Sequence, residues 1–199
     1  MELSRAMKQF LGREVASASA EFMYRSMSAL RGGRKEEQTA SFLDVLKGCI
    51  QNPRVRFLQI SLVRHRTLQK RSFYCIQTFG KEFYLSPPIQ EKELDWKWMY
   101  EPYDRFCQRV ADESRKYVMQ LSKQEVRQIC LLELEETKVM VKELFQEVLP
   151  HLLGDEGIRR LCREREVEIQ LSDYMGAYEP LLSLNQQTEK VGEWMNGIL

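Results

Sequence analysis

The 199-residue chain has few of the patterns on which common enzyme and metal sites depend. It contains two histidines, no CxxC pair and no Cys/His cluster with zinc spacing, so no metal site is expected. The phosphate-binding loops GxxxxGKS/T and GxGxxG and the nucleophile motif GxSxG are also missing. These absences argue against a nucleotide-binding loop and against a hydrolase of the nucleophile-elbow type, and no cofactor is expected.

Long hydrophobic runs are missing too. No stretch of about 18 consecutive apolar residues occurs, so no membrane span is expected. The opening stretch, MELSRAMKQFLGREV, mixes charged and apolar residues and does not resemble a secretory signal. Five cysteines, an odd number and widely spaced, predict free buried thiols in a reducing compartment. We therefore expect a cytoplasmic protein.

What is present is ordinary material for a soluble globular protein: 43% hydrophobic residues, 30% charged residues and a net charge of +1. The length suits a single domain, residues 1–199, with subdomains 1–90 and 91–199 as the alternative division. The charge is unevenly distributed. Residues 54–81 hold seven Lys or Arg and no Asp or Glu, whereas residues 82–199 are acidic overall.

Helical periodicity dominates both ends of the chain. Residues 2–31 predict one helix, which Gly32-Gly33 ends with a glycine in the left-handed conformation. A capping box, Ser122 and Glu125, predicts the start of a long helix that ends at Pro150. Further helices are predicted over about 36–50, 94–99, 102–119 with Pro102 in the first turn, a short stretch after Asp155, and 178–196.

Strand patterns lie between the helices. β-branched and aromatic residues predict strands over 54–64, 71–79 and 82–86, which form a three-stranded meander over about 54–86. Gly80-Lys81 fits a two-residue hairpin, and Pro87-Pro88 is expected to end the meander. VEIQL (167–171) is compatible with a fourth strand. The fold class predicted is α+β, a small antiparallel sheet packed with helices from both the N-terminal and C-terminal segments.

The basic meander is one candidate site. Anion or nucleic-acid binding needs several cations that converge, and the stretch supplies them near its strand ends. A solvated turn that complements the acidic second half is the alternative interpretation. The candidate residues for binding an anion or nucleic acid are Arg56, Arg64, Arg66, Lys70 and Arg71.

A second candidate is the aromatic stretch DWKWMYEPYDRF, residues 95–106. Trp and Tyr are favoured at protein interfaces because each joins an apolar body to a polar group. The alternative interpretation is an aromatic layer packed in the core. The candidate residues for binding a partner are Trp96, Trp98, Tyr100 and Tyr103.

The helix over 129–153 carries Glu133, Glu136, Glu143 and Glu147, but His151 does not complete a di-iron pattern. A solvated acidic face is expected. The surplus apolar residues Leu131, Leu132, Val139 and Leu149 suggest either a central helix or a dimer face. We therefore expect a non-enzymatic interaction or regulatory module that acts through a protein partner or a homo-oligomer. Nucleic-acid or anion binding through residues 54–81 is the alternative. An enzyme built on carboxylates or a lone thiol stays open, because such residues need no fixed spacing.

Overall fold

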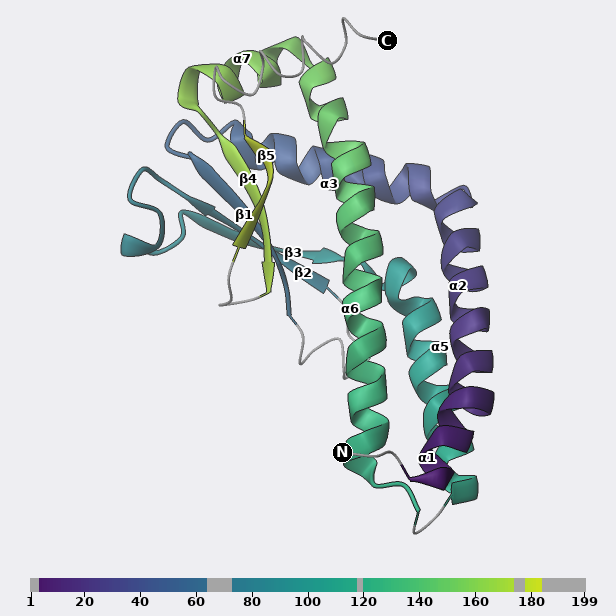
Figure 1. The fold of residues 1–199 in the computed structure, drawn as a ribbon. Helices are drawn as coiled ribbons and strands as arrows, with labels where there is room; N and C mark the ends of the chain where they lie inside the picture. The colour runs from purple at the N-terminus through teal and green to yellow at the C-terminus, as the bar shows by residue number, and fades with distance from the viewer. Residues whose placement is uncertain (1–3, 64–72, 118–119, 174–177, 184–199) are drawn as a thin grey trace, which may run out of the picture. The chain divides into compact units, whose positions relative to one another are not determined.

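A computed structural model describes residues 4–63, 73–117, 120–173 and 178–183 (Figure 1). The chain divides into two compact units, which are described separately. The helical unit comprises Met1–Lys35 and Lys97–Val141, and the sheet unit comprises Glu36–Trp96 and Lys142–Leu199. The α+β fold class predicted from the sequence is confirmed. No helix within the described ranges is long and apolar enough to cross a bilayer.

The helical unit begins with one continuous helical run, formed by α1 (Arg5–Phe10), the π-helical segment η1 (Leu11–Val15) and α2 (Ala16–Arg31). Ser4 caps the run, because its hydroxyl oxygen accepts the Met7 N–H at 3.1 Å. The helix predicted for this region is thus confirmed from Arg5 onward. Gly32 ends α2 in an extended conformation, with φ −80° and ψ 156°, so the expectation of a left-handed glycine is wrong.

Two further helices complete this unit. α5 (Lys97–Ser114) continues into the 3-10 turn η3 (Arg115–Tyr117), and α6 (Lys123–Val148) contributes its part up to Val141. The predicted capping box is confirmed: the Ser122 N–H donates to the Glu125 carboxylate at 2.7 Å, and the Glu125 N–H donates to Ser122 Oγ at 3.2 Å. Pro102 lies inside α5 rather than in its first turn, because α5 already begins at Lys97.

Aromatic rings form the core of the helical unit. Phe22 on α2 meets Phe106 on α5 edge-on, with ring centroids 6.1 Å apart, and Phe10 meets Tyr117 at 5.2 Å. Phe10, Phe22 and Phe106 are all buried. Burying a Phe side chain stabilises a fold by roughly 1.5–3 kcal/mol, so these rings hold the N-terminal helical run against α5 and η3.

The sheet unit contains a five-stranded mixed sheet in the order β3-β2-β1-β4-β5. Neighbouring strands are antiparallel except for β1 and β4, which are parallel. The predicted fourth strand is therefore confirmed as β4, next to β1, and the sheet has one strand more than expected. The strands are β1 (Phe57–Leu62), β2 (Phe73–Phe79), β3 (Gln90–Asp95), β4 (Glu168–Asp173) and β5 (Tyr178–Ser183).

Three stretches form a different type of secondary structure from the one predicted from the sequence. Residues 82–86 are not a strand: Phe83–Leu85 form a 3-10 turn, η2, in which Phe83 has φ 47° and its ring packs against Phe57 and Phe79 at 4.7 and 5.2 Å. No hairpin forms at Gly80-Lys81, and Pro87-Pro88 precede β3 instead of ending the meander. The short helix predicted over 94–99 is wrong, since β3 runs to Asp95. The helix predicted over 178–196 begins as β5, and its part from 184 onward lies outside the described residues.

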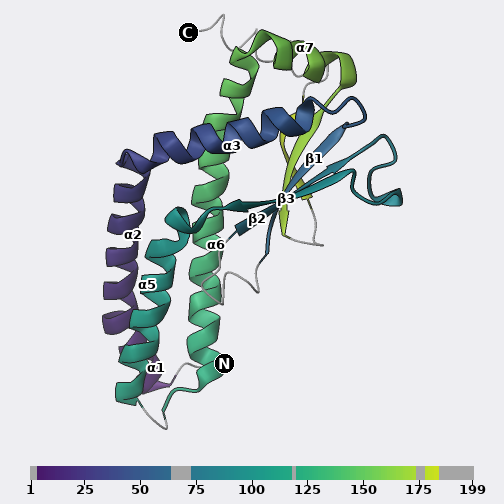
Figure 2. The same cartoon turned by 180° about the vertical axis from the view of Figure 1, so that it is seen from behind.

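The helices of the sheet unit are α3 (Arg34–Ile50, from Glu36 onward), the last turns of α6, the 3-10 segment η4 (Leu149–Gly154) and α7 (Glu156–Arg165). α3 lies beside the strands in both views (Figures 1 and 2). Phe42 of α3 stacks on Phe145 of α6 at 4.7 Å, and Tyr74 of β2 meets Phe145 at 5.4 Å. These rings join α3, α6 and the sheet into one core.

The parallel pair β1–β4 carries a buried polar ladder. Gln59 lies opposite Gln170 and Ser61 lies opposite Ser172, and all four side chains are buried. Gln59 Nε2 donates to Ser172 Oγ at 2.7 Å, and the two serine hydroxyls are 2.8 Å apart. Because a shift by one residue would turn these groups to the other face, the ladder fixes the register of the two strands.

Candidate functional site

The aromatic residues predicted to bind a partner lie mostly in the interior. Trp96, Tyr100 and Tyr103 are at most 1% exposed, and Trp98 is 8% exposed. The hydroxyl of Tyr103 donates to the carbonyl oxygen of Cys130 at 3.1 Å, which ties α5 to α6. Trp98 lines a surface hollow. Partner binding by this set stays a prediction, and it now depends on Trp98.

Of the basic residues predicted to bind anions, Arg56 can be placed. Its guanidinium donates to the carbonyl oxygens of Pro53 and Val55 at 3.1 and 3.0 Å, so part of its donor capacity serves the local turn. Arg64, Arg66, Lys70 and Arg71 lie outside the described residues. The convergence of these cations therefore stays a prediction.

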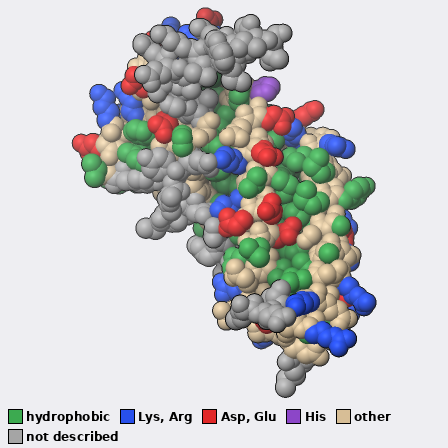
Figure 3. All heavy atoms as spheres, viewed as in Figure 1, with side chains coloured by type: hydrophobic (Ala, Val, Ile, Leu, Met, Phe, Trp, Pro, Cys, Tyr) green, Lys and Arg blue, Asp and Glu red, His purple; other side chains and the backbone are tan. Residues whose placement is uncertain are grey.

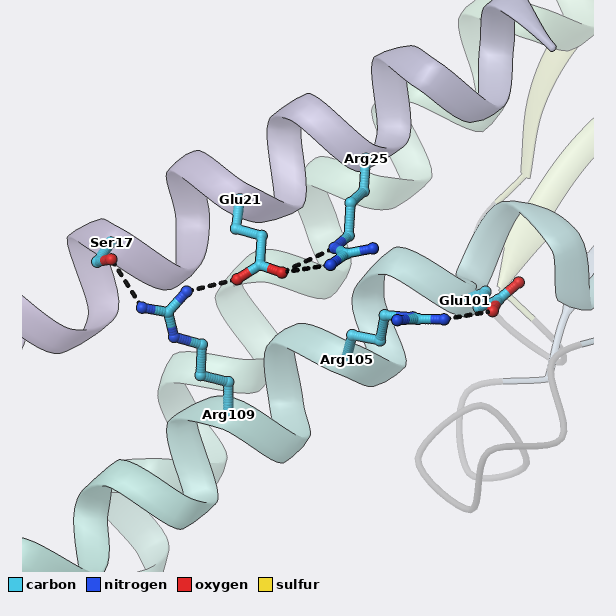
Figure 4. Close-up of polar contacts among 6 residues, drawn as sticks. All are labelled: Ser17, Glu21, Arg25, Glu101, Arg105 and Arg109. Carbon is cyan, nitrogen blue, oxygen red and sulfur yellow. Dashed lines mark hydrogen bonds and ion pairs between the residues drawn. The ribbon is translucent and has the colours of Figure 1, made fainter.

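The helical unit has a polar groove between α2 and α5, which Figure 4 shows. The Glu21 carboxylate accepts from Arg25 Nε at 2.8 Å and also from Arg109 of α5. Arg109 donates in addition to Ser17 Oγ at 2.7 Å, so it links two turns of α2. The hydrogen bonds from Arg25 and Arg109 hold the pKa of Glu21 below its usual value.

Two adjacent hollows follow this groove, each with a volume of about 330–340 Å³. Three arginines and one carboxylate, Glu101, line the first hollow, together with Trp98 and exposed Tyr24. Arg105 pairs with Glu101 at 3.0 Å, and Arg34 lies 3.9 Å from the same carboxylate. The arginines of this groove thus already have carboxylate partners within the chain. They are Arg25, Arg34, Arg105 and Arg109.

A different surface lies on the other side of α2, where α2 meets α6. The hydroxyl of Ser19 donates to the Glu133 carboxylate at 3.2 Å, which joins the two helices. The same two helices carry exposed large apolar side chains: Met23 is 48% exposed and Met27 41%, while Leu132 is 61% exposed and Val139 52%. Figure 3 shows hydrophobic side chains gathered over α2 and α6, with carboxylates among them. We call this surface the α2–α6 face, defined by Ser19, Met23, Met27, Leu132, Glu133, Glu136 and Val139.

Helical spacing explains how these residues share a face. Met23 and Met27 are four residues apart on α2, and Leu132, Glu136 and Val139 follow one another at four and three residues on α6. The face was only partly predictable from the sequence. Leu132 and Val139 were among the surplus apolar positions of the predicted long helix. Met23 and Met27 continue the apolar stripe of α2, so nothing in the sequence distinguishes them from buried residues.

Glu133 is the titratable group at the centre of this face. Its side chain is half-buried, and desolvation raises the pKa of its carboxyl, with a smaller contribution from the negative charge of Glu136. The Ser19 hydroxyl lowers the pKa in part. Neither Glu133 nor Glu136 takes part in an ion pair within the described residues.

Most of the cysteines are poor nucleophiles. A hydrogen bond with Cys130 and burial raise the pKa of the Cys107 thiol, and burial raises the pKa of Cys75 to about 12 and that of Cys162 to about 11. A thiol with a raised pKa is a poor nucleophile at neutral pH. Cys130 differs, because its hydrogen bond with Cys107 lowers the pKa of its thiol, but its side chain is buried. Among the described residues, no group of three or more His, Cys, Asp or Glu side chains could hold a metal ion.

Known proteins provide no further guide to the site. The chain matches no family model, no curated protein and no solved structure. A function can therefore be inferred only from the surfaces of the protein, and two surfaces of the helical unit are candidates: the α2–α5 groove and the α2–α6 face.

Proposed function

We propose that this protein is a non-enzymatic interaction module that binds another protein through the α2–α6 face, in a reducing compartment such as the cytoplasm. One observation carries the proposal. Of the six large hydrophobic side chains that are exposed in the described residues, four belong to this one face. Single exposed apolar residues are normal on a protein surface, but a group on two neighbouring helices is typical of an interaction site.

The residue types support the same function. Methionine side chains are flexible and polarisable, so they adapt to a partner and recur on binding surfaces. The α2–α5 groove supports it less well, because its arginines already pair with Glu21 and Glu101 within the chain. A ligand there would have to compete with these existing ion pairs.

The test compares two surface variants of the full chain. Met27→Ser with Leu132→Ser changes the face, and Arg105→Ser changes an exposed residue of α5 that lines the α2–α5 groove. A protein that co-purifies with the wild type is identified and purified, and its affinity for each form is measured by calorimetry. We expect the double variant to bind at least about tenfold more weakly, because two apolar anchors are lost, and Arg105→Ser to bind like the wild type.

Equal affinity of the wild type and the double variant would remove the α2–α6 face from the proposal. Sedimentation of the purified chain tests the self-association alternative, since a homo-oligomer that uses this face would dissociate in the double variant.

The second candidate function is anion or nucleic-acid binding through residues 54–81, favoured by their seven basic and no acidic residues. Fluorescence anisotropy with short DNA and RNA across a salt series tests it. Replacement of Arg64, Arg66, Lys70 and Arg71 by alanine should abolish binding and flatten the salt dependence. Absence of binding at low salt would exclude this function.

A further inference from the structure

The α2–α6 face contains negative charge that has no cationic partner among the described residues. Glu133 is half-buried and accepts one hydrogen bond, from Ser19. Glu136 lies one turn further along α6 and is exposed. Two carboxylates on one side of a helix repel each other, and partial burial strengthens the repulsion because the local dielectric is lower than that of water.

The neighbouring α2–α5 groove shows how the same unit treats its other acidic groups. Glu21 pairs with Arg25 and Arg109, and Glu101 pairs with Arg105. The carboxylates of the groove are thus paired with arginines, whereas Glu133 and Glu136 of the α2–α6 face pair with no cation among the described residues. A Lys or Arg of another molecule could pair with these carboxylates without displacing an arginine of this chain.

The arrangement of the apolar residues suggests the shape of the occupant. α2 and α6 run in the same direction (Figures 1 and 2), and the Ser19–Glu133 bond joins them. At about 1.5 Å per residue, Met23 and Met27 are about 6 Å apart along α2, and Leu132 and Val139 are about 10 Å apart along α6. The exposed apolar side chains thus form two rows, each one to two helical turns long. This length matches the stretch over which an amphipathic helix presents apolar residues at positions i, i+3, i+4 and i+7.

We infer that the α2–α6 face binds an amphipathic helix of another protein, whose apolar side chains contact Met23, Met27, Leu132 and Val139 and whose Lys or Arg residues pair with Glu133 and Glu136. This inference rests on the proposed function and names the chemistry of the partner. A second copy of this chain fits less well. A two-fold dimer would bring two copies of Glu133 and Glu136 into one interface without adding a cation to pair with them, and like charges oppose such an interface.

The experiment uses the full chain and two synthetic peptides of about five helical turns, both with leucine at i, i+3, i+4 and i+7. One peptide has lysine at the flanking positions and the other has glutamate. We expect the Leu/Lys peptide to bind in calorimetry and the Leu/Glu peptide not to bind. Raising the salt from about 0.05 M to about 0.3 M should weaken binding, because screening shortens the reach of surface charge.

Variants separate specific binding from general attraction to acidic protein. Glu133→Gln with Glu136→Gln should lower the affinity roughly five- to thirtyfold and reduce its salt dependence, as expected when two exposed ion pairs of about 0.5–1 kcal/mol each are lost. The control, Glu156→Gln with Glu164→Gln, makes the same charge change on α7 and should leave the affinity unchanged.

The inference is overturned if the two peptides bind equally, if the Leu/Glu peptide binds better, if neither binds, or if the two glutamine pairs have equal effects. The proposed function is judged separately. If the co-purified protein still binds more weakly to the Met27→Ser, Leu132→Ser variant, the face binds a partner of different chemistry. If that protein binds the variant and the wild type equally, the face has no binding role.

Discussion

At the scale of single residues, Glu133 connects stability with the proposed binding role. Its carboxylate is half-buried, and among the described residues only the Ser19 hydroxyl donates a hydrogen bond to it. Desolvating a charge costs free energy unless it is paired, so this residue lowers stability in the free protein. A residue that costs stability on a surface is often explained by what binds there.

The pH dependence of stability tests this cost. The pKa of Glu133 is raised in the folded state, so the folded protein binds its proton more readily than the unfolded chain does. The contribution of Glu133 to stability is therefore unfavourable above its folded pKa and disappears as the pH falls below the ordinary carboxyl value. Glu133→Gln should raise the free energy of unfolding at pH 7 by about 0.5 kcal/mol or less, because solvent screens a half-exposed charge.

Urea denaturation of both forms across pH 4–8 measures the effect. The difference between Glu133→Gln and the wild type should shrink as the pH falls. A difference that is constant with pH, or a less stable Gln variant at pH 7, would show that Glu133 is not desolvated as described.

Tyr103 makes a second prediction at this scale. Its hydroxyl donates to the Cys130 carbonyl, and burial raises its pKa, so it stays protonated at neutral pH. Tyr103→Phe removes one buried hydrogen bond and should cost about 1 kcal/mol of the free energy of unfolding. The control is Tyr24→Phe, the same change at an exposed position, which should leave the free energy of unfolding unchanged. Equal stability of Tyr103→Phe and the wild type would contradict the bond.

At the scale of elements, local signals in the sequence account for the helices better than for the strands. The Ser122–Glu125 box marks the start of α6 because both groups of the motif lie within one turn and need no tertiary partner. Phe83 shows the opposite case. Residues 82–86 have a strand-like sequence but form a turn, because the ring of Phe83 packs on the rings of Phe57 and Phe79. The local sequence pattern does not reveal these ring contacts.

The long-range pairing of β1 with β4 could be expected only in part. VEIQL has strand character, but its parallel alignment next to Phe57–Leu62 depends on contacts more than 100 residues apart, such as Gln59 to Ser172. The same limit applies to the candidate site. The pattern along α6 suggested that Leu132 and Val139 exceed the needs of one core, but their closeness to Met23 and Met27 depends on how α2 packs beside α6.

The capping box provides the prediction at this scale. Ser122→Ala removes the acceptor for the Glu125 N–H and should destabilise the start of α6 by about 1 kcal/mol. Hydrogen exchange of the amides in the first turn of α6 should speed up more than exchange near Leu134. Ser122→Asp, which keeps an acceptor, should restore most of the protection, and if it does not, capping is not the cause.

At the scale of the whole molecule, the two units differ in what they offer to other molecules. The described part of the sheet unit buries Tyr74 and Trp96 around Phe42 and Phe145, with Leu85 as its one large exposed hydrophobic side chain. The helical unit exposes apolar residues on α2 and α6 and keeps a paired polar groove on the other side of α2. We therefore place recognition on the helical unit.

The most direct measurement is photo-crosslinking from two surfaces of the full chain. Benzoylphenylalanine replaces Met27 of the α2–α6 face in one form and Arg105, which lines the α2–α5 groove, in the other, since both side chains are exposed. We predict an adduct from position 27 that maps to a basic amphipathic helix of one identified protein, and no such adduct from position 105. Adducts to the same protein from both positions, or from position 105 alone, would contradict the assignment of partner binding to the α2–α6 face.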